Sequence, residues 1–336
     1  MAALSVLDLS PVTTATPPSV ALHNSLDLAR LVDRLGYTRL WRAEHHNLAN
    51  IASSAPDIMI GQVAAITQNI RVGSGGVMLP NHAPLMVMER FKVLEALFPG
   101  RIDLGLGRAP GTDQITSLAL RRRQDTANEQ DDFLDRFQEM MLFESNGFPP
   151  NHPFSKVSAM PTDVKLPPIW LLGSSGYSAE LAAHVGAGFS FAHHFSDFPP
   201  EVPMLNYRRE FKPSAWRDTP YAILGVAAIC ADTEADADRL AMSADLHFAR
   251  RAVGQYGPLA SPEEAAAYPY TPIDRQRIEH NRKRLIVGSP AQVHARITSL
   301  AESTKADEVM ITTMVFDHAA RKHSYELLAR EFGLKP

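Results

Sequence analysis

The chain has 336 residues, of which 45% are hydrophobic and 21% are charged, and its formal net charge is −4. This composition predicts a globular protein with a large core, and the weak acidic balance favours neither nucleic acid nor a membrane surface as a partner. No apolar run is long enough to span a bilayer, and the first residues lack the basic region of a signal peptide. We therefore expect a cytoplasmic protein. Its single cysteine, Cys230, ends an apolar run and is expected to be a buried, unreactive thiol.

Short apolar, β-branched runs alternate along the chain with stretches of helical periodicity. The runs predict strands at 4–10, 38–44, 71–77, 102–107, 168–173, 188–194, 223–231 and 307–313. Helices are expected between them, for example at 20–36, 84–100, 178–188 and 233–253.

Strands separated by helices indicate a parallel sheet, because parallel neighbours need a crossover connection. Eight such units predict an α/β protein of the (β/α)₈ TIM-barrel type, a single domain over 1–336 with loop insertions, in preference to an open doubly wound sheet. Three segments interrupt the alternation: 108–127, which shows no clear helix, 145–167, and the proline-containing 254–284. The last is expected to be a mobile insertion or a lid.

In a barrel of this type, chemistry is built where the strands end. The first strand ends at Ser10, and the second runs into Glu44, His45 and His46. An imidazole there can act as a general base or as a hydrogen-bond donor, or serve only a structural role. A metal site would need a further ligand, for which no characteristic spacing is present.

Two glycine-containing segments follow later strands. In "GLGRAPGTD", the spacing of the glycines does not fit a dinucleotide-binding loop and instead suggests a turn that lets Arg108 reach an anion. "GSSGYSAELAAHVG" places hydroxyls before a helix, so its N-terminus could bind an anion, or one serine could simply cap the helix. The residues of this second segment are Ser174, Ser175, Gly176, Tyr177 and Ser178.

Together these segments resemble the luciferase-like, flavin-dependent monooxygenases. The resemblance covers most of the chain and is densest in "LSVLDLSPV", "RLWRAEHHN", "VGSGGVMLPNHAPLMVMERFKVLEALFPGRIDLGLGRAPG", "WLLGSSGYSAELAAHVG" and "ADEVMITTMVFDHAARKHSYELLA". It is weakest over 108–167 and 250–284. Bacterial luciferases proper have a reactive cysteine at the position of Gly107 and an acidic residue at that of Ser174, so light emission is not implied.

The resemblance implies a flavin mononucleotide (FMN) site and assigns roles to its residues. Glu44 and His45 would be catalytic, and Arg108 would pair with the phosphate, together with the 174–178 segment. Ser10 and Ser74 would also line the site. Gly75 and Gly76 would be joined by a cis peptide bond against the flavin ring and leave room for it, although a plain β-bulge is the alternative reading of two glycines in a strand.

The implied function is oxygenation of a small organic substrate, such as an aldehyde or ketone, by reduced FMN and oxygen. Because no nicotinamide-binding motif is evident, a separate flavin reductase would supply the reduced flavin, and family members commonly form homodimers. The alternatives are a deazaflavin-dependent dehydrogenase on the same fold and a flavin-binding protein without turnover. His193 and His194, which end the sixth strand, have no role that the resemblance assigns.

Overall fold

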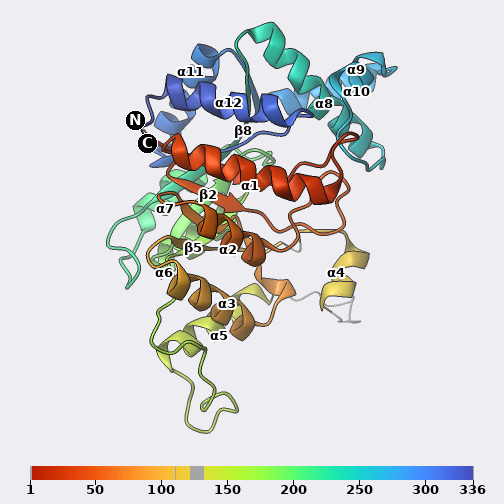
Figure 1. Ribbon diagram of the computed structural model, residues 1–336. Coiled ribbons are helices and arrows are strands. Elements are labelled where there is room, and N and C mark those ends of the chain that lie inside the picture. Colours follow the sequence, from red (N-terminus) through yellow and green to blue (C-terminus); the bar gives the residue numbers. More distant parts are fainter. Residues whose placement is uncertain (1, 110, 122–131, 336) are drawn as a thin grey trace.

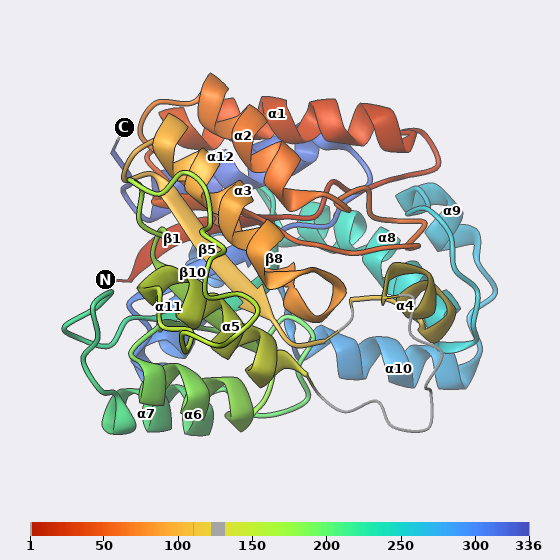
Figure 2. The same cartoon turned by 90° about the horizontal axis from the view of Figure 1, so that it is seen from below.

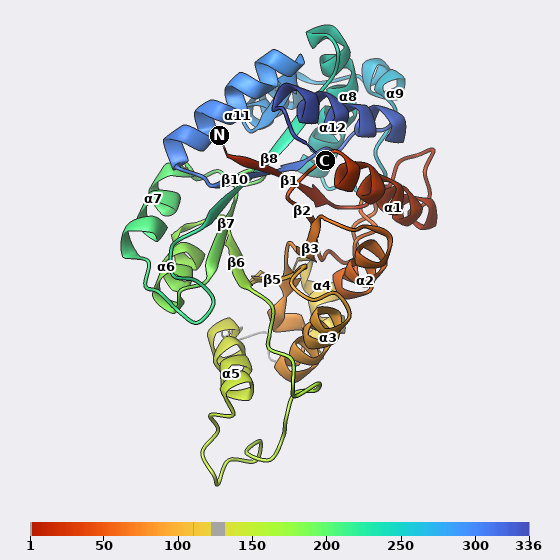
Figure 3. The ribbon, with the colours of Figure 1, turned by 60° about the vertical axis from the view of Figure 1, so that its left-hand side comes forward.

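The computed structural model describes residues 2–109, 111–121 and 132–335, which form a closed barrel of parallel strands surrounded by helices (Figure 1). Each barrel strand pairs with the next along the chain, and the last pairs with both the first and the seventh, which closes the ring (Figure 3). The barrel strands are β1 (Ala3–Asp8), β2 (Arg39–Arg42), β3 (Arg71–Ser74), β5 (Ile102–Gly107), β6 (Ile169–Gly173), β7 (Gly188–Ala192), β8 (Ala222–Cys230) and β10 (Glu308–Thr312). The prediction of a (β/α)₈ barrel is confirmed.

Two short strands supplement the ring. β4 (Val77–Met78) resumes the path of β3 and pairs with β5, and β9 (Leu285–Gly288) pairs with the end of β8. The helices are α1 (Pro18–Arg34), α2 (Pro56–Ile66), α3 (Pro84–Leu97), α4 (Gln114–Arg121), α5 (Phe133–Ser145), α6 (Gly176–Val185), α7 (Glu201–Glu210), α8 (Glu234–Ala252), α9 (Pro262–Ala267), α10 (Pro272–Arg282), α11 (Pro290–Thr304) and α12 (His318–Glu331), with a 3₁₀ turn η1 (Leu79–Asn81).

The amino-terminal half of the barrel is filled by a polar cluster, which we call the plug: the buried Arg39, Asp103 and Glu308 and the half-buried Arg71. Arg39 donates to Asp103 and Glu308, at 2.7 Å each, and Arg71 lies 2.6 Å from Asp103. Around the plug stand the indoles of Trp41 and Trp170, both of which donate to Asp103. The plug leaves only the carboxyl ends of the strands for a site.

Outside the ring, apolar side chains of the strands pack against those of the helices in one large core. Cys230 lies in this core, fully buried, and burial raises the pKa of its thiol to about 12. The prediction that this thiol is buried is confirmed, and its raised pKa agrees with the expected low reactivity. No helix of the described residues is both long and apolar enough to cross a membrane.

The three irregular segments have different structures. The expectation of no helix in 108–127 was wrong for α4, which begins where Asp113 accepts the Thr116 amide at 3.0 Å. Segment 146–167 contains neither helix nor strand and projects from the barrel as an arm (Figures 1 and 3). Segment 254–284 contains α9 and α10, each begun by a capping box, and packs against α8.

Candidate functional site

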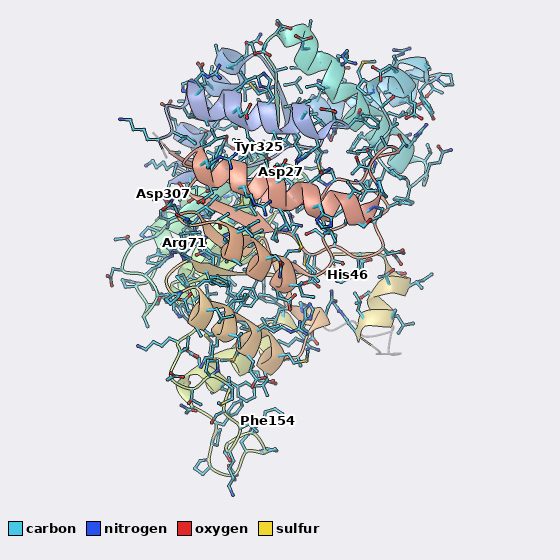
Figure 4. All side chains as sticks on the ribbon, in the orientation of Figure 1. Asp27, His46, Arg71, Phe154, Asp307 and Tyr325 are labelled. Carbon is cyan, nitrogen blue, oxygen red and sulfur yellow. The ribbon has the colours of Figure 1, made fainter. Side chains whose placement is uncertain are left out.

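The carboxyl ends of the strands open on the side of α4, α9 and α10, and the two chain termini lie at the opposite end of the barrel (Figure 2). In Figure 4, His46 lies at this open end, which we call the mouth, whereas Arg71 and Asp307 lie at the other. The predicted catalytic residues follow β2 at the mouth.

Glu44 is 1% exposed and holds the exit of β2 in place. One carboxylate oxygen accepts from the imidazoles of His46 and His82, at 2.9 and 2.8 Å, and the other accepts from the Met78 amide at 2.9 Å. Burial would raise the pKa of Glu44, but these hydrogen bonds outweigh it and hold the pKa below its usual value. The carboxylate is therefore charged and fully engaged, which suits a residue that positions its neighbours.

His45 is half-buried beside this carboxylate, and its ring is oriented by a carbonyl. Its Nδ1 lies 3.2 Å from the Gly111 carbonyl oxygen. Burial lowers the pKa of His45, although the Gly111 hydrogen bond and the Glu44 charge oppose the shift. The neutral ring is thus favoured at pH 7. Because a carbonyl only accepts, the proton is assigned to Nδ1, which leaves Nε2 with a lone pair.

The 111–113 loop is fixed over the end of β2. The Thr112 hydroxyl donates to the His46 carbonyl at 2.8 Å, and the Asn47 amide group donates to Asp113 at 3.0 Å. Gly111 has a φ of +67°, and a Cβ there would lie 3.0 Å from the Glu44 carbonyl oxygen. Only glycine meets both conditions without displacement. Sequence reasoning treated this glycine as part of a permissive turn and missed its contact with His45.

The peptide bond between Gly75 and Gly76 is cis, as predicted. The structure also gives a packing reason for the two glycines. A Cβ on Gly75 would lie 2.8 Å from a Leu7 methyl carbon, and one on Gly76 would lie 2.8 Å from the Gly105 carbonyl oxygen. The missing side chains therefore make room for neighbouring protein atoms, and the role of these glycines beside a flavin ring stays a prediction. The adjacent Ser74 hydroxyl donates to the Gly105 carbonyl and accepts from its amide, so it is engaged with β5.

Ser10 is not brought together with the other predicted residues. Its hydroxyl is fully buried between the barrel and α1, where it bonds to Ser25 at 2.8 Å and accepts from the Arg42 guanidinium. Arg42 and Arg321 both donate to the buried carboxylate of Asp8. Ser10 thus belongs to a polar network behind the strands, because its side chain points away from the inside of the barrel.

Arg108 and the 174–178 segment do come together. The Arg108 guanidinium lies 4.4 Å from the centre of the Tyr177 ring, in the first turn of α6. Ser175 occupies the N-cap position, but its hydroxyl accepts no bond from the described amides of that turn. Ser178 packs against Gly173, where a Cβ would lie 2.6 Å from the serine oxygen. A guanidinium, hydroxyls and helix amides form a donor set that suits a phosphate.

Further histidines surround the mouth. His194 approaches the Gly225 carbonyl, with its amide at 3.0 Å and its Nδ1 at 3.4 Å, and burial lowers its pKa to about 4. Nδ1 of His193 is buried with no hydrogen-bond partner among the residues that the structure describes. His247, on α8, accepts from the Asn50 amide group at 3.3 Å, and burial lowers its pKa to about 4.

Sequence reasoning missed His82 and His247 because neither adjoins the end of a predicted strand. Their approach to the mouth depends on the course of η1 and on the direction of α8, which no local pattern encodes. In the described part of the chain, no group of three or more His, Cys, Asp or Glu side chains is arranged to hold a metal ion.

Comparison with known proteins adds a family match over most of the chain. The model of the luciferase-like monooxygenase family matches residues 3–308. A luciferase-like monooxygenase of Escherichia coli (strain K12) is 42% identical over 97% of this chain and 95% of its own. The N-acetyl-S-alkylcysteine monooxygenase of Bacillus subtilis (strain 168) is 32% identical over 98% of both chains.

Solved structures share the architecture. The structure of apo-MsnO8 matches with a TM-score of 0.90 at 37% identity, over 100% of this chain and 98% of that one. Two others share the fold at lower identity. The oxygenating constituent of 3,6-diketocamphane monooxygenase from Pseudomonas putida, in complex with FMN, has a TM-score of 0.71 at 18% identity and covers 98% and 97% of the two chains. An F420-dependent secondary alcohol dehydrogenase has a TM-score of 0.69 at 11% identity and covers 97% and 99%.

Proposed function

We propose that this chain, which belongs to the luciferase-like monooxygenase family, binds FMN at the mouth of its barrel and oxygenates a small organic substrate. The observation that carries the proposal is the contact between Arg108 and Tyr177 at the start of α6. This contact brings Arg108, after β5, beside the 174–178 segment, after β6, so their hydrogen-bond donors could bind one phosphate dianion together. The oxygenating constituent of 3,6-diketocamphane monooxygenase, whose structure contains FMN, supports the choice of FMN among flavins through the shared fold.

The residues present fit the cofactor at its phosphate end. Arg108 would hold the phosphate, aided by Ser174, Ser175 and the backbone amides of Gly176, Tyr177 and Ser178. Gly75, which is partly exposed, would border the ring, and the buried Ser74 and Gly76 would support it from behind. Ser10 has no part in the proposed site, because its hydroxyl is committed to Arg42 and Ser25.

The proposed reaction assigns His45 the proton-handling role. When bound, reduced flavin supplies two electrons with which oxygen is split, one atom entering the substrate and the other leaving as water. His45 would accept or hold a proton at Nε2, because its Nδ1 is directed to Gly111. Glu44 would act as a positioning residue through His46, His82 and the Met78 amide. The 111–113 loop would help to exclude water.

A flavin titration tests the cofactor assignment. Arg108→Ala should weaken FMN binding by about 2–3 kcal/mol, the range for loss of a charge-assisted contact, and leave riboflavin binding unchanged. Arg34→Ala, which removes an exposed arginine from the last turn of α1, is the control. Equal losses for FMN and riboflavin would show that Arg108 does not bind the phosphate. A parallel titration with a deazaflavin tests the dehydrogenase alternative, which the fold shared with the alcohol dehydrogenase keeps open.

Turnover tests the reaction. We expect a separate flavin reductase as partner, since the sequence contains no nicotinamide-binding motif. With such a reductase and oxygen, a panel of aldehydes, ketones and N-acetyl-S-alkylcysteines should yield an oxygenated product. His45→Ala should lower turnover by about 10²–10⁴ and change FMN affinity by less than about tenfold. Hydrogen peroxide as the sole product across the panel would favour a flavin-binding protein without turnover.

A homodimer is the expected assembly, and an apolar face of α3 supports it. Met86, Val93 and Leu97 fall on one side of the helix and are 47%, 47% and 65% exposed. Ile58, on the neighbouring α2, is 66% exposed. Leu97→Asp should therefore shift the mass in sedimentation from dimer to monomer. An unchanged mass would place any interface elsewhere.

A further inference from the structure

A pocket of about 300 Å³ lies between the last turn of α8 and the loop that follows it. This volume is at the low end of the range for small-molecule sites. The side chains that shape it belong to His247, Arg250, Gln255, Tyr256, Pro258 and Tyr268. None of them is in the set described above as the phosphate site.

The pocket adjoins the mouth through two short connections. His247 in its wall accepts from Asn50, which lies in the same loop as His45. Leu259 donates its amide to the Val12 carbonyl at 2.9 Å, which ties the pocket loop to the exit of β1. Arg251, the next residue after Arg250, is near enough to His45 for its charge to lower the pKa of the imidazole.

The side chains of the pocket wall favour an anionic ligand with an apolar part. Arg250 is the only cation among the lining residues, none of which is acidic. Its guanidinium lies 5.4 Å from the centre of the Tyr268 ring, and it forms no ion pair with any residue that the structure describes. Tyr256, Pro258 and Tyr268 provide apolar surface, while Gln255 and His247 add uncharged polar groups. A guanidinium on an aromatic and apolar wall matches a carboxylate attached to an apolar body.

We infer that this pocket binds the carboxylate of an amphipathic substrate whose apolar part extends toward His45 at the mouth. The inference rests on the proposed function, because it names the substrate class of the same reaction centre. The last turn of a helix favours cations in any case. Arg330 is therefore the control residue: it also lies in the last turn of a helix, α12, but does not line the pocket.

Calorimetric titration of the full chain with 4-phenylbutyrate and its uncharged amide tests the inference. The carboxylate should bind at least tenfold more tightly than the amide. Arg250→Met should abolish this preference, Arg250→Lys should retain part of it, and Arg330→Met should leave it intact. Tyr256→Ala, at a side chain that is 67% exposed, should weaken both probes alike by removing apolar wall.

Equal affinities for the two probes, or an undiminished preference in folded Arg250→Met, would overturn the inference. Thermal melts of every variant establish that it is folded. The titration is repeated with and without FMN, so the two proposals fail separately. Tight FMN binding without carboxylate preference refutes only the substrate class, whereas carboxylate preference without FMN binding refutes only the flavin site.

Discussion

At the scale of single residues, a backbone carbonyl, and not only side chains, orients the His45 imidazole at the mouth. His45 has two ring nitrogens, and which of them can take a proton is decided by Gly111, whose oxygen lies 3.2 Å from Nδ1. Gly111 in turn keeps its place because its φ is +67° and it approaches the Glu44 backbone closely. The orientation of the His45 imidazole thus depends on Gly111 having no side chain.

Gly111→Ala should consequently lower turnover by about tenfold or more while FMN affinity stays unchanged. The new methyl would meet the Glu44 carbonyl at 3.0 Å and displace the loop from His45. Nitrogen NMR of His45 should then report a mixture of ring tautomers. Gly100→Ala is the matched control, because Gly100 also has positive φ, +74°, but a Cβ there meets nothing within 4 Å. Equal activity of the two variants would contradict the assigned role.

Much of the site could be predicted from residues at strand ends. Glu44, His45, Arg108 and Tyr177 all lie where the alternation of strands and helices places them. Ser10 was wrongly grouped with them, since the end of a strand does not reveal to which face of the sheet a side chain points. Gly111 could have been suspected from its position after Arg108, but its partner lies in another loop.

At the scale of elements, a side chain bridges a gap in the backbone pairing between β3 and β5, which we call the seam. Backbone pairing between these strands involves Val72 and Gly73, and β4 resumes it only at Val77. Across the interruption, the Ser74 hydroxyl both donates to and accepts from the backbone of Gly105, at 2.8 and 2.9 Å. The barrel wall is therefore continuous in hydrogen bonding, although its strand is broken.

Ser74→Ala should destabilise the fold by about 2–3 kcal/mol, because it leaves a buried amide and carbonyl of Gly105 without this partner. Urea denaturation measures the change. Ser54→Ala, at an exposed serine, should leave the midpoint nearly unmoved. If the two variants unfold at the same urea concentration, the seam does not need the hydroxyl.

Strands were easier to predict than helices. Most barrel strands contain a short apolar run, so their sequence pattern finds them with small errors at their ends. α4 was missed because it is only eight residues long, Gln114–Arg121, and follows a polar loop. β9 was missed because a strand of four residues, Leu285–Gly288, is recognisable only by its pairing with β8.

At the scale of the whole molecule, several half-buried histidines make stability depend on pH. Burial lowers the pKa of His45, His193, His194 and His247. The unfolded chain, with histidine pKa values near 6.5, therefore binds more protons than the folded chain between about pH 4 and 7. Stability should decrease as the pH falls through this range. His323 has the opposite sign, since a hydrogen bond to Asp232 raises its pKa.

We expect the midpoint temperature of thermal unfolding to decrease when the pH is lowered from 7 to 5. His194→Gln should flatten this decline, by about 1 kcal/mol at pH 5 after allowance for partial exposure. His323→Gln should make the decline steeper, because the variant lacks the protonated imidazole whose hydrogen bond to Asp232 stabilises the wild type at low pH. Parallel declines in the wild type and both variants would mean that other groups control the acid response.

The plug makes the inside of the barrel accessible from one end. Arginines, carboxylates and indoles fill the amino-terminal half, so the inside of the barrel opens only at the mouth. Any small molecule that reaches the inside of the barrel would therefore have to enter and leave on the side of the mouth. The direction of access is then set by side chains at the far end of the barrel, which take no part in the proposed reaction.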